Sequence, residues 1–465
     1  MTVDEQIATG GGVVVDTISK EEVLEQAKAD VKKEKLGLIP KTVKRLRKWK
    51  IFATTKDNET LFVYNSDKGV FEGGEDAIVK GKIQEFIKGG TRNNLVVEII
   101  NTIKRETYMN RNDFEANKEW INVKNGMLNL RTRELVKHDP GFLSLKQIPV
   151  VYDPDADCPV LKKFLSEVVS VEDARDIMRF WGYTLAPHCK YDKAIVFVGV
   201  GSNGKSVLLT TVTKFFGLEN TSNESLKTLC DNKFRDAELF GKIANIKSEL
   251  SAVSPVHSEN FKALVSGLDT ITGEKKNKDP FKFRNVAKIW CSCNQLPNVD
   301  FNDIAWYRRW ITILFPRKFV ACVDANVNLD AELTTESEKS GALNMALQGY
   351  KELETAGGFA NWNDTDKVRR LYVAYAGNSV ARFGIEKLVF NAASQDTILK
   401  EDLYRAYEQY HEVQSRNSIV KEPVRAYDTF YRDLEVLFGI KERECRISGG
   451  SDDRQRALKG VVVVK

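Results

Sequence analysis

Short apolar runs alternate with amphipathic helical patterns through the middle of the chain. Three runs stand out, at 194–198, 239–249 and 286–293, and each leads into glycine or polar residues. Continuous apolar runs of this length are typical of buried strands, and apolar residues at every third or fourth position indicate helices between them. Strands separated by helices form a mostly parallel sheet, which binds its ligands at the carboxyl ends of the strands. The pattern therefore predicts an α/β core.

The regions on either side of this core have different patterns. Ahead of it we expect strands at 61–64 and 70–71, helices at 83–87 and 95–103, a hairpin at Asn125-Gly126, and helices at 159–170 and 172–185. Beyond Asn378 the periodicity is helical at 383–390, 398–414 and 425–438, and the chain finishes with a strand at 457–464. Helices followed by a strand pair are typical of a small winged-helix module.

The first core run leads into Gly199-Val-Gly-Ser-Asn-Gly204-Lys205-Ser206. A buried strand, a Gly-rich loop and a helix together are the context of a phosphate-binding P-loop. Lys205 can reach the β- and γ-phosphates, and the Ser206 hydroxyl can take a Mg²⁺ coordination position. The candidate nucleotide-binding residues are Gly199, Gly201, Ser202, Asn203, Gly204, Lys205, Ser206 and Val207. The sequence therefore predicts binding of a nucleoside triphosphate, ATP with Mg²⁺.

Polar residues behind the P-loop supply the other requirements of hydrolysis. Glu249 follows the second core run and can organise Mg²⁺ together with Ser206, while Asn294 follows the third run and can sense the γ-phosphate. The doublet Arg308-Arg309 can supply positive charge to the transition state. Taken singly, these residues could be a surface acid, a turn residue and a surface pair. Their order and spacing behind a P-loop favour the catalytic interpretation.

Composition and charge narrow the class of protein only slightly. The net charge of +5 is the difference between 70 basic and 65 acidic residues among 465, so nucleic-acid binding has to rest on local clusters. The segment Lys32–Lys50 holds nine Lys or Arg residues and one Glu, and it is either a DNA-contacting patch or a solvated helix face. The seven cysteines have no zinc-site spacing, and no apolar run approaches the roughly 20 residues of a membrane span. An odd cysteine count without a signal peptide predicts a reducing, intracellular setting.

From about residue 110 onward the chain resembles the superfamily 3 helicases that accompany primases in phages, plasmids, mobile islands and poxviruses. The resemblance rests on the P-loop and on motifs that follow it in family order. Segments 241–250, 264–276, 292–297 and 306–309 are similar to the Walker B segment, the B′ motif, motif C and the arginine finger. Segments 125–132, 138–140 and 152–155 are similar to the helical region ahead of the family's ATPase.

The resemblance implies an AAA+ fold assembled as a ring, usually a hexamer, with ATP held between subunits. It would place the Arg doublet against the neighbour's P-loop, and Lys275, Lys276 and Lys278 on a hairpin that lines the pore and follows DNA phosphates. Phe281 and Phe283 on that hairpin are better explained as core residues than as base-stacking ones. Together with the patterns above, the expected domains are a basic α+β region at 1–110 (its first 35 residues flexible), a helical collar-like region at 111–185, the ATPase at 186–345 and a winged-helix-like DNA-binding domain at 378–465.

Two departures from the family pattern affect the expected chemistry. The Walker B segment has Ser248-Glu249 where many AAA+ proteins have two acids, so Ser206 and Glu249 are left to hold the metal. The region ahead of residue 110 is too short for a primase domain, so priming is assigned to another chain or to a missing segment.

These inferences converge on a ring-forming, ATP-dependent replicative DNA helicase of a phage, plasmid or mobile element in a bacterial or archaeal host, with 3′→5′ polarity implied by the family. The C-terminal helices, with Arg446, Arg454, Arg456 and Lys459, leave two interpretations open. They form either a winged helix that touches duplex DNA, as in a replication initiator, or a lid or oligomerisation module. The alternative function is a non-translocating ring NTPase that acts as a switch or assembly factor, and a small-molecule kinase is a weaker third.

Overall fold

The computed structural model describes residue 25 and residues 37–74, 76–87, 93–199, 201–231, 237–250, 258–274, 280–297, 303–320, 326–359, 365–375, 377–390, 397–417, 423–440, 443–445 and 455–464. Contacts divide the chain into two units. The first is Met1–Asn65 with Phe71–Arg111, and the second is Ser66–Val70 with Asn112–Lys465.

The first unit is a small α+β structure. Residues 37–49 are helical, and they are followed by β1 (Phe52–Thr55), β2 (Leu61–Asn65), β3 (Val70–Gly73), α2 (Asp76–Ile87), α3 (Asn93–Glu106) and β4 (Tyr108–Met109). The sheet has the order β3-β2-β1-β4, with β1 antiparallel to β2 and parallel to β4. Its core gathers apolar side chains from all three helices and from β1 and β2. The expected strands and helices are present, and β1 and β4 are additions to them.

The second unit begins with a three-stranded antiparallel sheet and two helices. The strands are β5 (Trp120–Val123), β6 (Gly126–Asn129) and β7 (Leu135–Val136), and the hairpin expected at Asn125-Gly126 joins the first two. The helices are α4 (Pro159–Val168) and α5 (Val171–Leu185), close to the predicted bounds. The Ser170 hydroxyl caps α5 by accepting a hydrogen bond from the Asp173 amide, which explains why this helix begins where it does.

The centre of the second unit is the predicted parallel sheet. Its order is β14 (Trp310–Leu314), β8 (Ala194–Val198), β13 (Lys288–Cys293), β10 (Ala244–Lys247) and β9 (Thr221–Ser222), and all four pairings are parallel. Both faces are covered, so β8 and β13 are buried along their whole length. This explains why they appear in the sequence as unbroken apolar runs.

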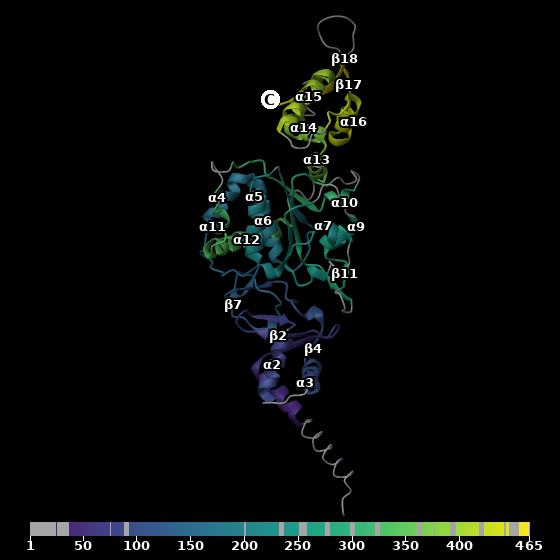
Figure 1. The fold of residues 1–465 in the computed structure, drawn as a ribbon. Helices are drawn as coiled ribbons and strands as arrows, with labels where there is room; N and C mark the ends of the chain where they lie inside the picture. Colours follow the sequence, from purple (N-terminus) through teal and green to yellow (C-terminus); the bar gives the residue numbers. More distant parts are fainter. Residues whose placement is uncertain are drawn as a thin grey trace, which may run out of the picture. The chain divides into compact units, whose positions relative to one another are not determined.

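Successive residues of β8 point to opposite helical layers. Ile195 and Phe197 pack with α4, α5, α6 (Lys205–Phe216) and α12 (Glu336–Ala356), whereas Val196 and Val198 pack with α7 (Leu226–Asp231), α9 (Ser258–Ser266) and α10 (Ile304–Tyr307). Figure 1 shows the two groups of helices on either side of the strands. The second layer also contains the predicted hairpin, β11 (Thr270–Gly273) with β12 (Phe281–Arg284). The core is therefore a helix–sheet–helix sandwich.

Helix α12 packs against α4 and α5, which come much earlier in the sequence. It packs along α5 so closely that a Cβ atom on Gly182 would lie 2.1 Å from the Ala346 carbonyl oxygen. The Glu338 carboxylate of α12 accepts hydrogen bonds from the Val160 and Leu161 amides, both at 3.1 Å, and so caps α4. The domain boundary expected at 345 lies inside this helix.

The C-terminal part combines helices with short antiparallel strands. The elements are α13 (Thr365–Tyr375), α14 (Ser379–Lys387), β15 (Leu388–Phe390), β16 (Thr397–Leu399), α15 (Lys400–Asn417), α16 (Tyr427–Phe438), β17 (Arg443–Cys445), β18 (Gln455–Lys459) and β19 (Val461–Val463). The sheets are β16-β18-β17 and β15-β19. The helix expected at 383–390 ends at Lys387 and continues as β15, and the expected terminal strand is divided at Gly460, whose φ is +76°. Within the described part of the chain, every helix is too short or too polar to cross a bilayer.

Candidate nucleotide site

The P-loop leaves β8 at the carboxyl edge of the sheet and enters α6. Ser202 and Gly204 have positive φ values, 57° and 90°, which turn the backbone sharply before the helix. A Cβ atom on Gly199 would lie 2.2 Å from the side-chain nitrogen Nδ2 of Asn203 and 2.6 Å from the Phe315 carbonyl oxygen, so only glycine fits there. The loop is held from outside by two contacts, Asn203 Nδ2 to Phe315 O at 3.2 Å and Phe319 N to Ser202 O at 2.7 Å.

Lys205, the first residue of α6, is buried and lies at the centre of this site. Its Nζ donates to the Gly199 carbonyl at 2.5 Å, to Asn203 Oδ1 at 2.9 Å and to Asn294 Oδ1 at 3.5 Å. These three acceptors are all neutral. Burial lowers the pKa of the Lys205 amine because its charge is partly desolvated. An anion beside the amine would restore the stability of the charged form.

Strand register brings the two other predicted catalytic residues to the same edge. Cys293 of β13 pairs with Val198 of β8, so Asn294 directly follows the strand end beside the P-loop. On the next strand, the Leu250 amide donates to the Ser292 carbonyl at 2.8 Å, and the Ser292 hydroxyl donates to the Ser248 carbonyl. These bonds fix the backbone of Ser248 and Leu250 on either side of Glu249, whose own side chain is exposed. Lys205, Asn294 and Glu249 therefore lie at the carboxyl ends of neighbouring parallel strands, where the sequence predicts the ligand site.

The residues at this edge fit a magnesium nucleotide. Ser206 and Glu249 both have exposed side chains with oxygen donors, the ligand type that Mg²⁺ prefers. Lys205 supplies a buried positive charge surrounded by neutral acceptors, and the first turn of α6 presents its amide groups to the same place. Among the described residues, no group of three or more His, Cys, Asp or Glu could hold a metal on its own. Magnesium would therefore depend on the phosphates as well as on the protein.

A cavity of about 580 Å³ opens beside the P-loop, within the usual size range of ligand pockets. One wall is the loop and α6, with Ser202, Gly204 and Val207. The other walls are α4 and four residues further along the chain, Phe319, Asn326, Leu329 and Glu332. Phe164 and Phe319 line it, and the Arg317 guanidinium lies 4.4 Å from the centre of the Phe319 ring. The lining combines apolar side chains with the charged Lys163, Glu167 and Glu332, and a cavity of this kind beside a phosphate-binding loop is suited to the base and ribose of a nucleotide.

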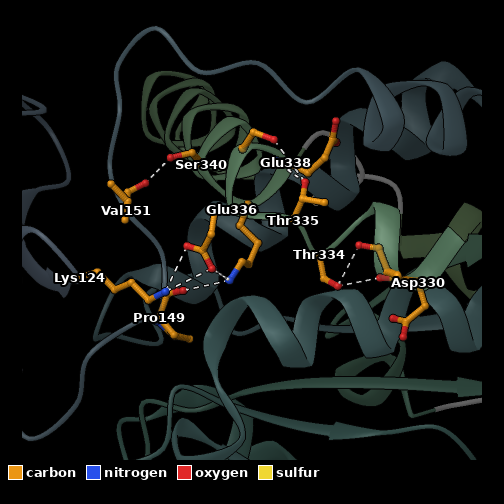
Figure 2. A network of polar contacts seen from close by, with 12 residues as sticks. Lys124, Pro149, Val151, Asp330, Thr334, Thr335, Glu336, Glu338 and Ser340 are labelled. Carbon is orange, nitrogen blue, oxygen red and sulfur yellow. Dashed lines mark hydrogen bonds and ion pairs between the residues drawn. The ribbon is translucent and has the colours of Figure 1, made fainter. Parts of the chain in front are cut away.

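Polar contacts around the start of α12 fix the wall of this cavity (Figure 2). The Glu336 carboxylate pairs with Lys124 at 3.1 Å and with Lys339 at 2.6 Å. The Thr335 hydroxyl caps α12 at the Glu338 amide, and the Thr334 hydroxyl donates to the Asp330 carbonyl at 2.7 Å. Asp330 belongs to α11 (Leu329–Glu332) and pairs with Lys214 of α6 at 2.5 Å. The P-loop helix and α11, whose Leu329 and Glu332 line the cavity, are thus joined by the Lys214–Asp330 ion pair.

The arginine doublet lies at the opposite edge of the sheet. Both residues precede β14, whose first residue Trp310 pairs with Ala194, the first residue of β8. The P-loop follows the other end of β8, four residues and about 13 Å further along. The doublet and the P-loop of one chain are therefore separated by the length of a strand.

The two arginines have different environments. Arg308 has an exposed side chain, and its carbonyl accepts a hydrogen bond from the buried amine of Lys193. Arg309 is buried, 7% exposed, and its Nη1 donates to the Ala305 carbonyl at 2.7 Å. Burial lowers the pKa of Arg309, and the neighbouring charge of Arg308 adds to this effect. The Arg308 side chain is exposed to solvent, whereas the Arg309 side chain stabilises the turn ahead of β14 through its hydrogen bond to Ala305.

The predicted DNA-binding hairpin can be followed only in part. Lys275, Lys276 and Lys278 lie outside the described residues. The strands that flank them are present, and Phe281 and Phe283 are each 6% exposed and pack with Phe240 in the core. This agrees with the expectation that the two rings face the core.

Sequence reasoning missed the residues that support the site from a distance. Phe315 and Phe319 follow β14 and contact the P-loop, and Phe164 on α4 lines the cavity. The rule that parallel strands place their carboxyl ends together could have identified the first two, because β14 was recognisable as an apolar run. Nothing in the local sequence indicates Phe164, since it reaches the site through the packing of α4.

Comparison with known proteins gives two family matches. Residues 27–170 match the family described as D5 N terminal like, and residues 197–309 match a family of unknown function, DUF5906. The second segment contains the P-loop, Glu249, Asn294 and both arginines.

Two viral proteins are similar to the chain. It is 24% identical over 297 residues to putative helicase V13 of Sputnik virophage, covering 59% of this chain and 36% of the relative. It is 23% identical over 269 residues to putative helicase L207/L206 of Acanthamoeba polyphaga mimivirus. This match covers 55% of this chain and 28% of the relative. The chain spans about a third of the length of these relatives.

Among solved structures, the apo C-terminal region of NrS-1 matches with a TM-score of 0.49 and 12% identity, over 89% of this chain and 97% of that one. The sequence matches confirm a resemblance to viral putative helicases and to the family described as D5 N terminal like.

Proposed function

We propose that this chain, with its similarity to the D5-like viral helicases, is an ATP-dependent DNA helicase that hydrolyses ATP between the subunits of a ring. The observation that carries the proposal is the cluster of Lys205, Asn294 and Glu249 at one edge of the parallel sheet. A buried lysine on a P-loop, a polar sensor and an exposed carboxylate are the groups that phosphoryl transfer to water requires.

Each group has a separate role in the proposed reaction. Lys205 neutralises charge on the β- and γ-phosphates, and its own partly desolvated charge gains from doing so. Asn294 already accepts a hydrogen bond from Lys205, so it can report whether the γ-phosphate is present. Glu249 polarises the attacking water. Mg²⁺, held with Ser206, would screen the developing negative charge.

The position of the arginines supports a site completed by a neighbour. Arg308 and Arg309 lie at the sheet edge opposite their own P-loop, and the exposed Arg308 side chain has no role within the chain's own site. In a ring built from head-to-tail contacts, one face of each subunit meets the other face of the next. We therefore assign Arg308 as the arginine finger, with Arg309 as its structural support. Hexamer formation and 3′→5′ polarity follow the family and belong to the proposal.

The first test is ATP hydrolysis with and without single-stranded DNA. Wild type should hydrolyse ATP faster when DNA is present, and Lys205→Ala should hydrolyse none under either condition. Thr355→Ala, an exposed substitution at the C-terminal end of α12, serves as a control that should behave as wild type. Hydrolysis that is insensitive to DNA would favour the switch or assembly-factor function, and hydrolysis retained by Lys205→Ala would rule out the assigned site.

A further inference from the structure

The helix at residues 37–49 in the first unit has one buried and one basic face. Thr42, Val43 and Leu46 are buried against the unit's core. The exposed side carries Lys41, Lys44, Arg45 and Lys48, which we call the basic stripe. The spacing of three and four residues places all four on one face of the helix.

Three arginines of this unit form ion pairs with described residues, whereas the lysines of the basic stripe, like Lys50, Lys56, Lys80 and Lys104, do not. Arg47 pairs with Glu106 at 3.1 Å, Arg105 with Glu98 at 3.0 Å, and Arg111 with Asp57 at 2.6 Å. By contrast, Lys41, Lys44 and Lys48 form no ion pair with any residue that the structure describes. Like charges three and four positions apart on a helix repel one another, so the stripe is unfavourable by itself. A polyanion would relieve that repulsion.

The C-terminal module has the opposite charge on its helical surface. In a helix-turn-helix arrangement the second helix of the pair enters the major groove, and here that helix is α16. Among the side chains that the structure describes on α15 and α16, with Arg425 two residues ahead of α16, the exposed charged ones are acidic at Glu401, Asp402, Glu408, Glu412, Asp428 and Glu435 and basic at Arg405, Arg425 and Arg432. A surface with this excess of carboxylates repels DNA phosphates.

We propose that the basic stripe binds the phosphate backbone of duplex DNA and that the α15–α16 surface does not. The inference rests on the proposed helicase function, which requires contact with a forked duplex. Duplex is favoured over single strands because single-strand sites add exposed aromatic rings for base stacking. The described aromatic side chains of this unit are buried or half-buried. Phosphate contacts of this kind are independent of sequence.

The length of the stripe sets the size of the expected effect. Seven residues separate Lys41 from Lys48, which is about 10 Å along the helix axis. At one charge per 3.4 Å of each strand, the stripe faces about three phosphates. Three lysine contacts should contribute about 2.7 to the slope of log affinity against log salt, because each contributes about 0.9 on duplex DNA.

The test measures binding of a fluorescent blunt duplex by the full chain over a range of salt concentrations, without ATP. The variant is Lys41→Gln/Lys44→Gln/Lys48→Gln, which leaves Arg45 in place because its Nη1 donates to the Phe86 carbonyl. The matched control is Arg405→Gln/Arg425→Gln/Arg432→Gln, which removes the same number of charges from the C-terminal module. We expect the stripe variant to bind duplex at least about tenfold more weakly at low salt, with a slope reduced by about 2.7, and the control to bind as wild type.

Two results would overturn the inference. One is a stripe variant that binds duplex as wild type does. The other is loss of binding in the control, or in a variant carrying Arg446→Gln and Arg454→Gln, because either would place duplex contact in the C-terminal module. Stimulation of ATP hydrolysis by single-stranded DNA, measured on the same samples, separates this outcome from failure of the helicase proposal. The stripe variant should retain that stimulation.

Discussion

Replacing Arg308 by alanine should abolish ATP turnover while leaving the fold and ATP binding intact. Arg308 is exposed and its side chain has no hydrogen bond or ion pair with the described residues, so removing it costs the subunit little stability. An arginine finger contributes about 10³–10⁵ in turnover. We therefore expect the Arg308→Ala rate to fall by at least about 10³, with an unchanged dissociation constant for ATP.

Arg309→Ala should have a different effect, because this residue is buried and bonded to the Ala305 carbonyl. Its removal leaves that carbonyl without its partner, at a cost of about 1–3 kcal/mol in the free energy of unfolding. The expected result is a lower melting temperature, with turnover per folded subunit that falls far less than in Arg308→Ala. Thermal melting and ATP hydrolysis measured on the same preparations distinguish the two variants.

Mixing inactive subunits tests whether Arg308 acts on a neighbour. Lys205→Ala subunits lack a working P-loop but keep Arg308, and Arg308→Ala subunits have the converse defect. In an equal mixture that reassembles at random, roughly a quarter of the interfaces combine an intact P-loop with an intact arginine, since the two sides of an interface come from different subunits. The mixture should therefore recover ATP hydrolysis that neither variant has alone. No recovery after confirmed subunit exchange would refute an inter-subunit site.

Three further predictions follow from particular contacts. Glu249→Gln should retain ATP without hydrolysing it, as measured by nucleotide retention on a spin column; normal hydrolysis would remove Glu249 from the site. Gly182→Ala should destabilise the second unit by about 3 kcal/mol or more because of its 2.1 Å approach to the Ala346 carbonyl, whereas Gly81→Ala, which has open space around it, should stabilise the first unit by about 1 kcal/mol. A Gly182→Ala variant as stable as wild type in denaturant unfolding would contradict the packing of α5 on α12. Burial, with the charge of Lys288 beside it, lowers the pKa of His188 to about 4, whereas an unfolded histidine has a pKa near 6.5. Between pH 6.5 and pH 4 the histidine is protonated in the unfolded chain but not in the folded one. The free energy of unfolding therefore falls by up to about 3 kcal/mol as the pH drops from 6.5 to 4. His188→Gln should reduce this loss of stability.

The sequence was sufficient to predict the parallel sheet and its ligand edge because both depend on local signals. Apolar runs marked β8, β10 and β13, and the P-loop glycines fixed which strand end holds the phosphates. Asn294 and Glu249 could be placed beside Lys205 because parallel strands end at a common edge.

Contacts between segments far apart in the chain could not be predicted from the sequence. The pairing of Glu338 with the start of α4 joins residues about 180 positions apart, and no local pattern indicates it. The difference between Arg308 and Arg309 depends on the direction in which each side chain leaves the turn ahead of β14. β1 was missed because Phe52-Ala-Thr-Thr55 is short and lacks the alternation of a half-buried strand, since all four of its residues are buried.

ATP-dependent displacement of a strand from a forked duplex tests the central claim most directly. The assay uses wild type and Lys205→Ala, with partial duplexes that carry either a 3′ or a 5′ single-stranded tail. The proposed helicase should displace the strand only with ATP and only when Lys205 is present, with a preference for the 3′ tail. Robust ATP hydrolysis by an assembled ring without displacement of any substrate would contradict the proposal.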